Sequence, residues 1–172
     1  GLLAFIEIPY LVITDIDTVD PADSRKSCPA NTADARTSNA ALKHYLKKDT
    51  RSDLLALMHE QCAVANDTCF IAFQREVEVA VNGNKQKLHG RTLEETFVYE
   101  NLELFRSGRL SINCKIGAQT SAAEIQQNVY DHIRSDNFKK TDFALSVISS
   151  DVEWATPNYI ATGLEWLETK LR

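Results

Sequence analysis

The first clear hydrophobic pattern is a short continuous run, Tyr10–Thr14, which is rich in β-branched residues. Such a run is typical of a strand that is buried on both faces, as in a parallel sheet. Residues 69–81 predict a second strand, because glutamate and valine alternate through its later part. Asn82-Gly83-Asn84 predicts a hairpin turn, from which the chain returns as a strand through Lys85–Leu88.

Polar and capping residues organise the segment between these strands. Residues 20–37 contain two prolines among many Asp, Ser and Thr residues, and this predicts a long mobile loop. Thr37-Ser38-Asn39 offers caps for a helix over Ala40–Lys48, and Ser52 is expected to cap the next helix. We therefore expect a helical insertion over residues 37–66.

Helix-start signals also divide the second half of the chain. Capping boxes at Thr92–Glu95 and Ser121–Glu124 each predict the start of a helix. Residues 141–149 are expected to be helical, and Pro157 is expected at the first position of a closing helix. The apolar face of that closing helix is predicted from four spaced residues: Ile160, Leu164, Leu167 and Leu171.

Strands mixed with helices, and a buried first strand, favour the α/β class. Hydrophobic residues make up 44% and charged residues 25% of the chain, ordinary values for a globular domain. No apolar run approaches the roughly 20 residues of a membrane helix. The four cysteines form no C-x-x-C pair, so reduced thiols in or near the core are expected rather than a zinc site.

The net charge of −5 restricts the function classes. A protein that grips DNA by neutralising phosphates alone is usually basic over one face. The acidic balance argues against a stand-alone DNA-binding module, but it is compatible with an enzyme that uses metal ions. No G-x-x-x-x-G-K-[ST] loop is present, so the chain has no recognisable ATPase site.

Asp15 and Asp17 carry the strongest chemical signal, because they follow the predicted strand directly. Ligands of open α/β sheets bind outside the carboxyl ends of the strands. Two carboxylates there favour a hard divalent cation such as Mg²⁺, to which Thr18 would add a hydroxyl. The alternative is that both aspartates serve as turn or cap residues. A calcium loop is excluded, because its sixth position is Asp20 instead of glycine.

Four segments carry a resemblance to a known family. Leu11–Asp17 resembles the D-x-D strand of Toprim domains. Thr37–Leu46, Gly90–Phe97 and Lys140–Ala144 resemble segments of the OLD-family ATP-dependent endonucleases, and they occur in the expected order over most of the chain. On this resemblance, residues 1–172 are identified as part of a Toprim nuclease domain, with a mainly parallel sheet flanked by helices, a helical insertion and a β-hairpin.

The resemblance implies hydrolysis of DNA phosphodiesters by a two-metal mechanism that uses Mg²⁺ or Mn²⁺. Asp15 and Asp17 match the family's D-x-D ligands, and Glu94 matches a further acidic ligand. Lys140 matches a lysine that neutralises charge developing on the phosphate. Glu94 has an alternative role, because a carboxylate in the first turn of a helix is favoured by the helix dipole. Lys139 stands beside Lys140 and is an alternative candidate for the role of Lys140. Glu95 is expected to be the capping partner.

One departure concerns the start of the domain. The family carries a Glu-Gly-x-x-Glu pattern on an earlier strand, whereas Glu7 is not followed by glycine. The resemblance then implies an N-terminally truncated sheet, an incomplete metal site and an upstream ATPase domain that handles ATP. It also implies DNA as substrate, a homodimer, no membrane association, and a cytoplasmic location in a bacterium or a phage-infected cell.

Two other functions stay open. Asp15-Ile16-Asp17 also looks like the opening motif of haloacid-dehalogenase-type phosphatases, with Asp15 as nucleophile and Asp17 as general acid and base. Such enzymes need a later acidic pair at a strand end, for which Asp151 and Glu153 are the candidates. The second alternative is a non-catalytic regulatory or assembly module, in which the acidic residues are only solvated caps.

Overall fold

The computed structural model describes residues 7–172, which form a mixed α/β structure in two compact units. Unit 1 comprises the chain up to Arg75 together with Pro157–Arg172, and unit 2 comprises Glu76–Thr156. The assignment of the whole chain to one Toprim domain stays a prediction. No helix within residues 7–172 has both the length and the apolar character needed to cross a bilayer.

Unit 1 contains a three-stranded sheet in the order β1 (Tyr10–Ile13), β6 (Cys69–Ala72), β5 (Ala63–Val64). β1 and β6 are parallel and in register from Tyr10 opposite Cys69 to Ile13 opposite Ala72, so both strands end at the same edge. The strand at Tyr10–Thr14 is confirmed, but its expected burial on both faces is wrong. β1 borders the sheet and is half-exposed, whereas the central strand β6 is fully buried.

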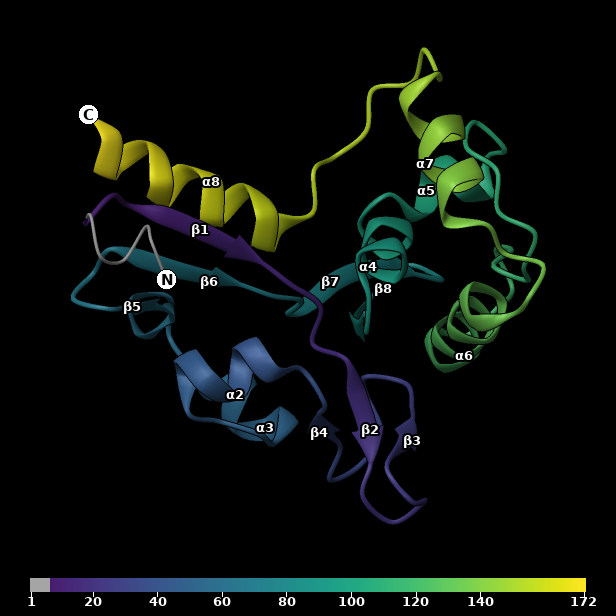
Figure 1. The fold of residues 1–172 in the computed structure, drawn as a ribbon. Coiled ribbons are helices and arrows are strands. Elements are labelled where there is room, and N and C mark those ends of the chain that lie inside the picture. Colours follow the sequence, from purple (N-terminus) through teal and green to yellow (C-terminus); the bar gives the residue numbers. More distant parts are fainter. Residues whose placement is uncertain (1–6) are drawn as a thin grey trace. The chain divides into compact units, whose positions relative to one another are not determined.

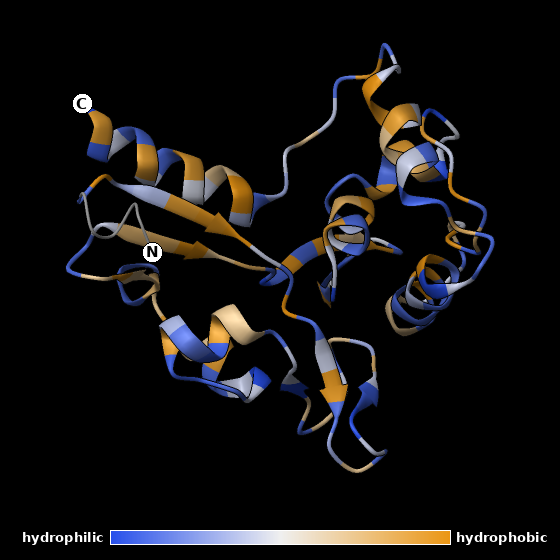
Figure 2. Cartoon of the chain, in the orientation of Figure 1, coloured by the Kyte–Doolittle hydropathy of each residue, from blue (hydrophilic) through white to orange (hydrophobic). Residues whose placement is uncertain are grey.

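Helices lie on both sides of β1 and β6 (Figure 1). α8 (Asn158–Leu171) runs along one side, and α2 (Ala40–Leu46) and α3 (Arg51–Ala56) lie on the other. Figure 2 shows apolar and polar residues alternating around α8, as expected of a helix with one face on a core.

The predicted buried face of α8 is wrong in part. Leu164 and Leu171 are 50% and 65% exposed, and the fully buried positions are Tyr159, Gly163 and Trp166. Gly163 explains why α8 buries a different face from the predicted one, because a Cβ atom at this position would come within 2.7 Å of Leu11 Cδ1. The helix therefore turns its smallest residue toward the sheet, and this close approach outweighs the leucine periodicity.

A second, antiparallel sheet forms within the loop predicted over residues 20–37, so that prediction is wrong in part. Its strands are ordered β3 (Lys26–Ser27), β2 (Thr18–Asp20), β4 (Arg36–Thr37). The short strands are joined by turn-forming residues, which gave the segment its loop-like composition. Three small side chains between them are nevertheless buried: Cys28, Ala30 and Ala35.

The segment 37–66 carries the helices α2 and α3 and a 3₁₀ turn, η1 (His59–Cys62). Asn39 caps α2 as expected. The cap of α3 is Thr50 and not the predicted Ser52, because the Thr50 side chain accepts from the backbone N–H of Asp53 at 3.1 Å. These helices lie in the connection between the parallel strands β1 and β6.

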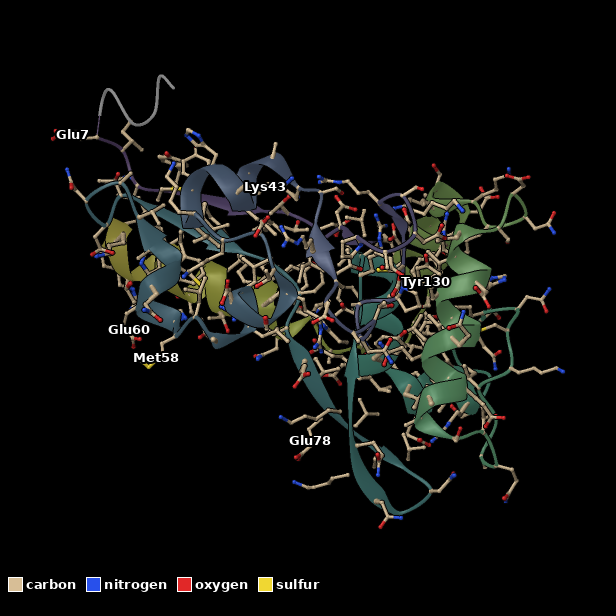
Figure 3. The ribbon with its side chains drawn as sticks, turned by 90° about the horizontal axis from the view of Figure 1, so that it is seen from below. Glu7, Lys43, Met58, Glu60, Glu78 and Tyr130 are labelled. Atoms are coloured by element: carbon tan, nitrogen blue, oxygen red, sulfur yellow. The ribbon has the colours of Figure 1, made fainter. Side chains whose placement is uncertain are left out.

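Unit 2 begins with the predicted hairpin, β7 (Glu76–Val81) and β8 (Asn84–His89). Glu78 stands on its exposed side (Figure 3), where it pairs with Lys85, while the alternate valines face the core. The predicted helix starts near residues 92, 121 and 141 are confirmed, and unit 2 has these helices: α4 (Leu93–Glu100), α5 (Leu102–Arg106), α6 (Ala122–Arg134) and α7 (Lys140–Ile148).

An aromatic cluster holds the helices of unit 2 together. The Phe97 ring meets those of Phe105, Phe143 and Trp154 edge-on, with centroids 6.1, 6.0 and 5.4 Å away. This geometry is favourable for aromatic quadrupoles and adds to the energy of burial. The hydrophobic cluster of unit 2 is therefore built mainly from helices and one face of a hairpin. Polar side chains such as Asn101 and Gln126 are buried in the same unit.

Candidate functional site

The acidic turn, Thr14–Asp17, directly follows β1 in unit 1. The backbone N–H of Thr14 donates to Ala72 O at 3.0 Å, so the turn starts where β1 and β6 end together. The carboxyl edge of parallel strands is where ligands bind in open α/β sheets. The predicted position of Asp15 and Asp17 at such an edge is confirmed.

Gln74 connects the acidic turn to the end of β6. Its Nε2 donates to Asp15 Oδ1 at 2.6 Å and to the hydroxyl of Tyr159 at 3.2 Å. Its Oε1 accepts from the backbone N–H of Ile16 at 2.7 Å. Gln74 is fully buried, so these bonds form away from competing water. One amide thus binds both the backbone and a carboxylate of the turn.

Asn39 binds the same turn from the other direction. Its Oδ1 accepts from the N–H groups of Ala41 and Leu42 at 2.8 and 3.3 Å, which caps α2. Its Nδ2 donates to Thr14 Oγ1 and to Asp15 O, both at 2.7 Å. A single side chain therefore fixes the start of α2 against the acidic turn.

Asp17 has a backbone conformation that is uncommon for an L-residue, with φ of 50°. Hydrogen bonds on both sides stabilise it. The Thr37 hydroxyl donates to Ile16 O at 2.5 Å, and Ser38 donates to Asp17 O through its N–H and its hydroxyl, both at 2.9 Å. Thr37 and Ser38 were expected to be helix caps, and the structure places them as supports of the turn.

Oxygen donors of the acidic turn suit a hard divalent cation, because Asp15 and Asp17 bring two carboxylates to one strand end. Thr18 is fully buried, and its hydroxyl donates to Cys28 O at 2.8 Å instead of extending toward a ligand. Among residues 7–172, no three or more His, Cys, Asp or Glu side chains gather in a way that would hold a metal ion.

Glu94 and Lys140, the other predicted site residues, lie in unit 2 and form an ion pair. Lys140 Nζ is 3.0 Å from Glu94 Oε1 and 3.2 Å from Oε2. The Glu94 side chain is only 13% exposed, whereas that of Lys140 is 60% exposed. Lys139 donates instead to Asp136 O, so the two neighbouring lysines are distinct in structure.

Glu95 takes a capping role, as expected, but it reaches one residue further back. It is buried, and its Oε2 accepts from the backbone N–H of Arg91 at 2.9 Å. The Thr92 side chain forms no cap hydrogen bond to α4, so the reciprocal box predicted between Thr92 and Glu95 is not formed. The box predicted at Ser121 and Glu124 is complete.

The cysteines behave as predicted, since all four are free thiols. Burial raises the pKa of Cys62 and Cys69, and it raises the pKa of Cys114 to about 11. These thiols therefore stay protonated at neutral pH and do not act as thiolate nucleophiles.

Gln74 and Tyr159 were not identified from the sequence. Asp15 and Gln74 each lie two residues past the end of their strands, β1 and β6. This correspondence was missed, because the sequence predicted one continuous strand over residues 69–81 with Gln74 inside it. Tyr159 gave no local signal, since its contact with Gln74 spans 85 positions along the chain.

The second acidic pair that the phosphatase alternative requires does not lie at a strand end. Asp151 and Glu153 would have to follow a strand, but Val147 and Ile148 are the last residues of α7 and Ser149 is its C-cap. Both acidic residues are exposed beyond the end of this helix in unit 2. The strand end that this mechanism requires is not formed there.

Comparisons with known proteins place the chain near a nuclease. No family model and no solved structure matches it. Over 99% of its length the chain is 28% identical to a protein named Endonuclease GajA from Bacillus cereus strain HuB5-5. The matched region is 25% of that relative, so the chain spans about a quarter of the relative's length.

Proposed function

We propose that this chain is part of a nuclease that hydrolyses phosphodiester bonds of DNA with the help of Mg²⁺ or Mn²⁺. The observation that carries the proposal is the acidic turn, which presents Asp15 and Asp17 at the shared carboxyl end of β1 and β6. The similarity to an endonuclease extends over 99% of the chain and supports the same reaction class. The family resemblance adds the Toprim fold and the two-metal mechanism to this proposal.

In this proposal the carboxylates of Asp15 and Asp17 hold the cation. A bound divalent cation supplies Lewis-acid stabilisation of a phosphoryl oxygen and a more acidic water. The protein's own contribution is to keep the two carboxylates in place before the substrate arrives. The hydrogen bonds from Gln74, Asn39 and Ser38 to the turn support that role.

The remaining roles rest on the resemblance. Glu94 is proposed as a further metal ligand, and Lys140 as a stabiliser of negative charge on the phosphate. The ion pair between them in unit 2 is compatible with a lysine that is shared between a carboxylate and a phosphate. An ATP-handling domain and a dimer are proposed on the same resemblance. The coverage of only a quarter of the relative is compatible with a further domain.

Nicking of supercoiled plasmid by the complete gene product, with Mg²⁺ or Mn²⁺ and with EDTA, tests the proposal. Asp15→Asn and Asp17→Asn keep the shape of each side chain and remove its charge, so each is expected to lower the nicking rate about 100-fold or more. Asp23→Asn is the matched control, because Asp23 is an exposed residue of the same unit that pairs with Lys26.

Nicking that persists in EDTA, or that survives both substitutions at the turn, would contradict the proposal. Cleavage of para-nitrophenyl phosphate without plasmid nicking would support the phosphatase alternative. No activity in either assay, together with no Mn²⁺ binding, would support the non-catalytic module.

A further inference from the structure

We infer that Gln74 is a positioning residue that sets the orientation of the Asp15 carboxylate for metal binding. The inference rests on the proposed function, because it concerns the same acidic turn. It adds a residue that lies outside the family motifs and whose role comes from geometry alone.

The amide of Gln74 can adopt only one orientation. Its Oε1 accepts from Ile16 N at 2.7 Å, and its Nε2 donates to Asp15 Oδ1 at 2.6 Å. A flipped amide would place its N–H₂ group against the Ile16 N–H and its oxygen against the carboxylate, and both contacts would be repulsive. The direction of the donor toward Asp15 is therefore fixed by the backbone of the turn itself.

The second N–H of the same Nε2 donates to the hydroxyl of Tyr159 at 3.2 Å. Tyr159 comes from the first turn of α8, and it is buried like Gln74. The amide thus uses both of its donors and one acceptor inside the core of unit 1. A side chain held at three points cannot follow a rotation of the Asp15 carboxylate, so it restricts that rotation.

A purely structural reading is that Gln74 only satisfies the buried N–H of Ile16. That task requires an acceptor and nothing more, and it does not explain a short donor contact to a carboxylate. Hydrogen bonds to metal-binding carboxylates orient them, and their loss typically lowers metal affinity or activity by about 10- to 100-fold. The two readings therefore differ in what happens to the metal requirement.

Gln74→Met removes all three hydrogen bonds at nearly constant volume. We expect the Mn²⁺ concentration for half-maximal nicking to rise about 10-fold or more, with most of the rate restored at saturating Mn²⁺. Gln126→Met is the matched control. Gln126 is also buried, and its amide donates to His89 O at 2.9 Å in unit 2. It should lower thermal stability without changing the Mn²⁺ requirement.

A direct binding measurement separates the two readings further. The Mn²⁺ dissociation constant, measured by calorimetry without DNA, should rise about 10-fold in Gln74→Met and stay unchanged in Gln126→Met.

An unchanged Mn²⁺ requirement and an unchanged Mn²⁺ dissociation constant in Gln74→Met would overturn the inference while leaving the nuclease intact. A wild-type protein that neither binds Mn²⁺ nor nicks DNA would overturn both the inference and the proposed function. A raised Mn²⁺ requirement in Gln74→Met alone, with Gln126→Met unaffected, would support the positioning role.

Discussion

The predicted site residues of the two units have different surroundings. In unit 1 buried polar side chains bind the acidic turn, with Gln74 on Asp15 and Thr37 on the backbone of Ile16. In unit 2 Glu94 meets Lys140, whose side chain is mostly exposed. Buried polar groups are costly unless they are satisfied, and surface ion pairs add little stability.

Unit 1 places amides and hydroxyls around a turn with a positive φ angle, and these groups hold Asp15 and the backbone of the turn. Unit 2 also buries polar side chains, such as Asn101 and Gln126, but its Glu94–Lys140 pair stands at the start of two helices with Lys140 mostly exposed. Substitutions in each unit should therefore affect stability and activity in different proportions.

The largest effect on stability is expected in unit 2 at Gly90. A Cβ atom there would lie 2.2 Å from Thr96 Oγ1 and 2.7 Å from Thr96 N, so either the start of α4 or the chain before it must move. Gly90→Ala should lower the free energy of unfolding by about 2–3 kcal/mol in urea denaturation. Gly117→Ala is the control, because nothing lies within 4 Å of the added Cβ.

A Gly90→Ala protein as stable as the wild type would show that the segment before α4 adjusts easily. Glu94 would then stand on a loosely packed helix start, and the contrast between the units would become stronger.

The next largest effect on stability is expected at two helix caps, Asn39 in unit 1 and Ser121 in unit 2. Ser121→Ala removes a capping box and should cost about 1 kcal/mol of stability, with nicking unchanged. Asn39→Ala removes a cap and also two donors to the acidic turn, so about 2 kcal/mol and a reduced nicking rate are expected.

Asn39→Asp refines this test, because the aspartate keeps the acceptor that caps α2 and lacks the donors to Thr14 and Asp15. It should retain most of the stability and still lose nicking activity. Equal nicking by the wild type and Asn39→Asp would mean that the turn does not depend on this contact.

The smallest effect on stability is expected at Lys140. An exposed ion pair contributes roughly 0.2–1 kcal/mol, so Lys140→Ala should barely change the unfolding free energy. If Lys140 stabilises charge on the phosphate, nicking should nevertheless fall about 10-fold or more. Lys139→Ala is the neighbouring control, since Lys139 donates to the backbone oxygen of Asp136 and not to Glu94.

Equal losses of activity in the two lysine variants would point to general attraction of DNA to a basic surface. Full activity in both would mean that the ion pair between Glu94 and Lys140 has no part in nicking.

Local signals account for what the sequence predicted correctly. The hairpin around Gly83, the capping box at Ser121 and Glu124, and the position of Asp15 after a strand each depend on a few neighbouring residues. Such features are decided by backbone conformation and short-range hydrogen bonds, which the sequence shows directly.

Features that depend on contacts between distant residues were missed. The face of α8 is set by the approach of Gly163 to Leu11, and not by the spacing of its leucines. The sheet over residues 20–37 consists of very short strands in a composition typical of loops. Gln74 contacts Asp15 only because β6 lies beside β1 in the fold, and this pairing of distant segments cannot be read from neighbouring residues.

The division of unit 1 along the chain sets an order of events during synthesis. The acidic turn and Gln74 leave the ribosome before unit 2, whereas Tyr159 lies 85 positions after its partner Gln74. At roughly 5–20 residues per second, about 4–17 seconds separate these two residues, enough time for a helical unit to fold. Unit 2 therefore has time to form while the sheet of unit 1 still lacks α8. The hydrogen bond between Gln74 and Tyr159, which completes the network around Asp15, forms only after α8 has been translated.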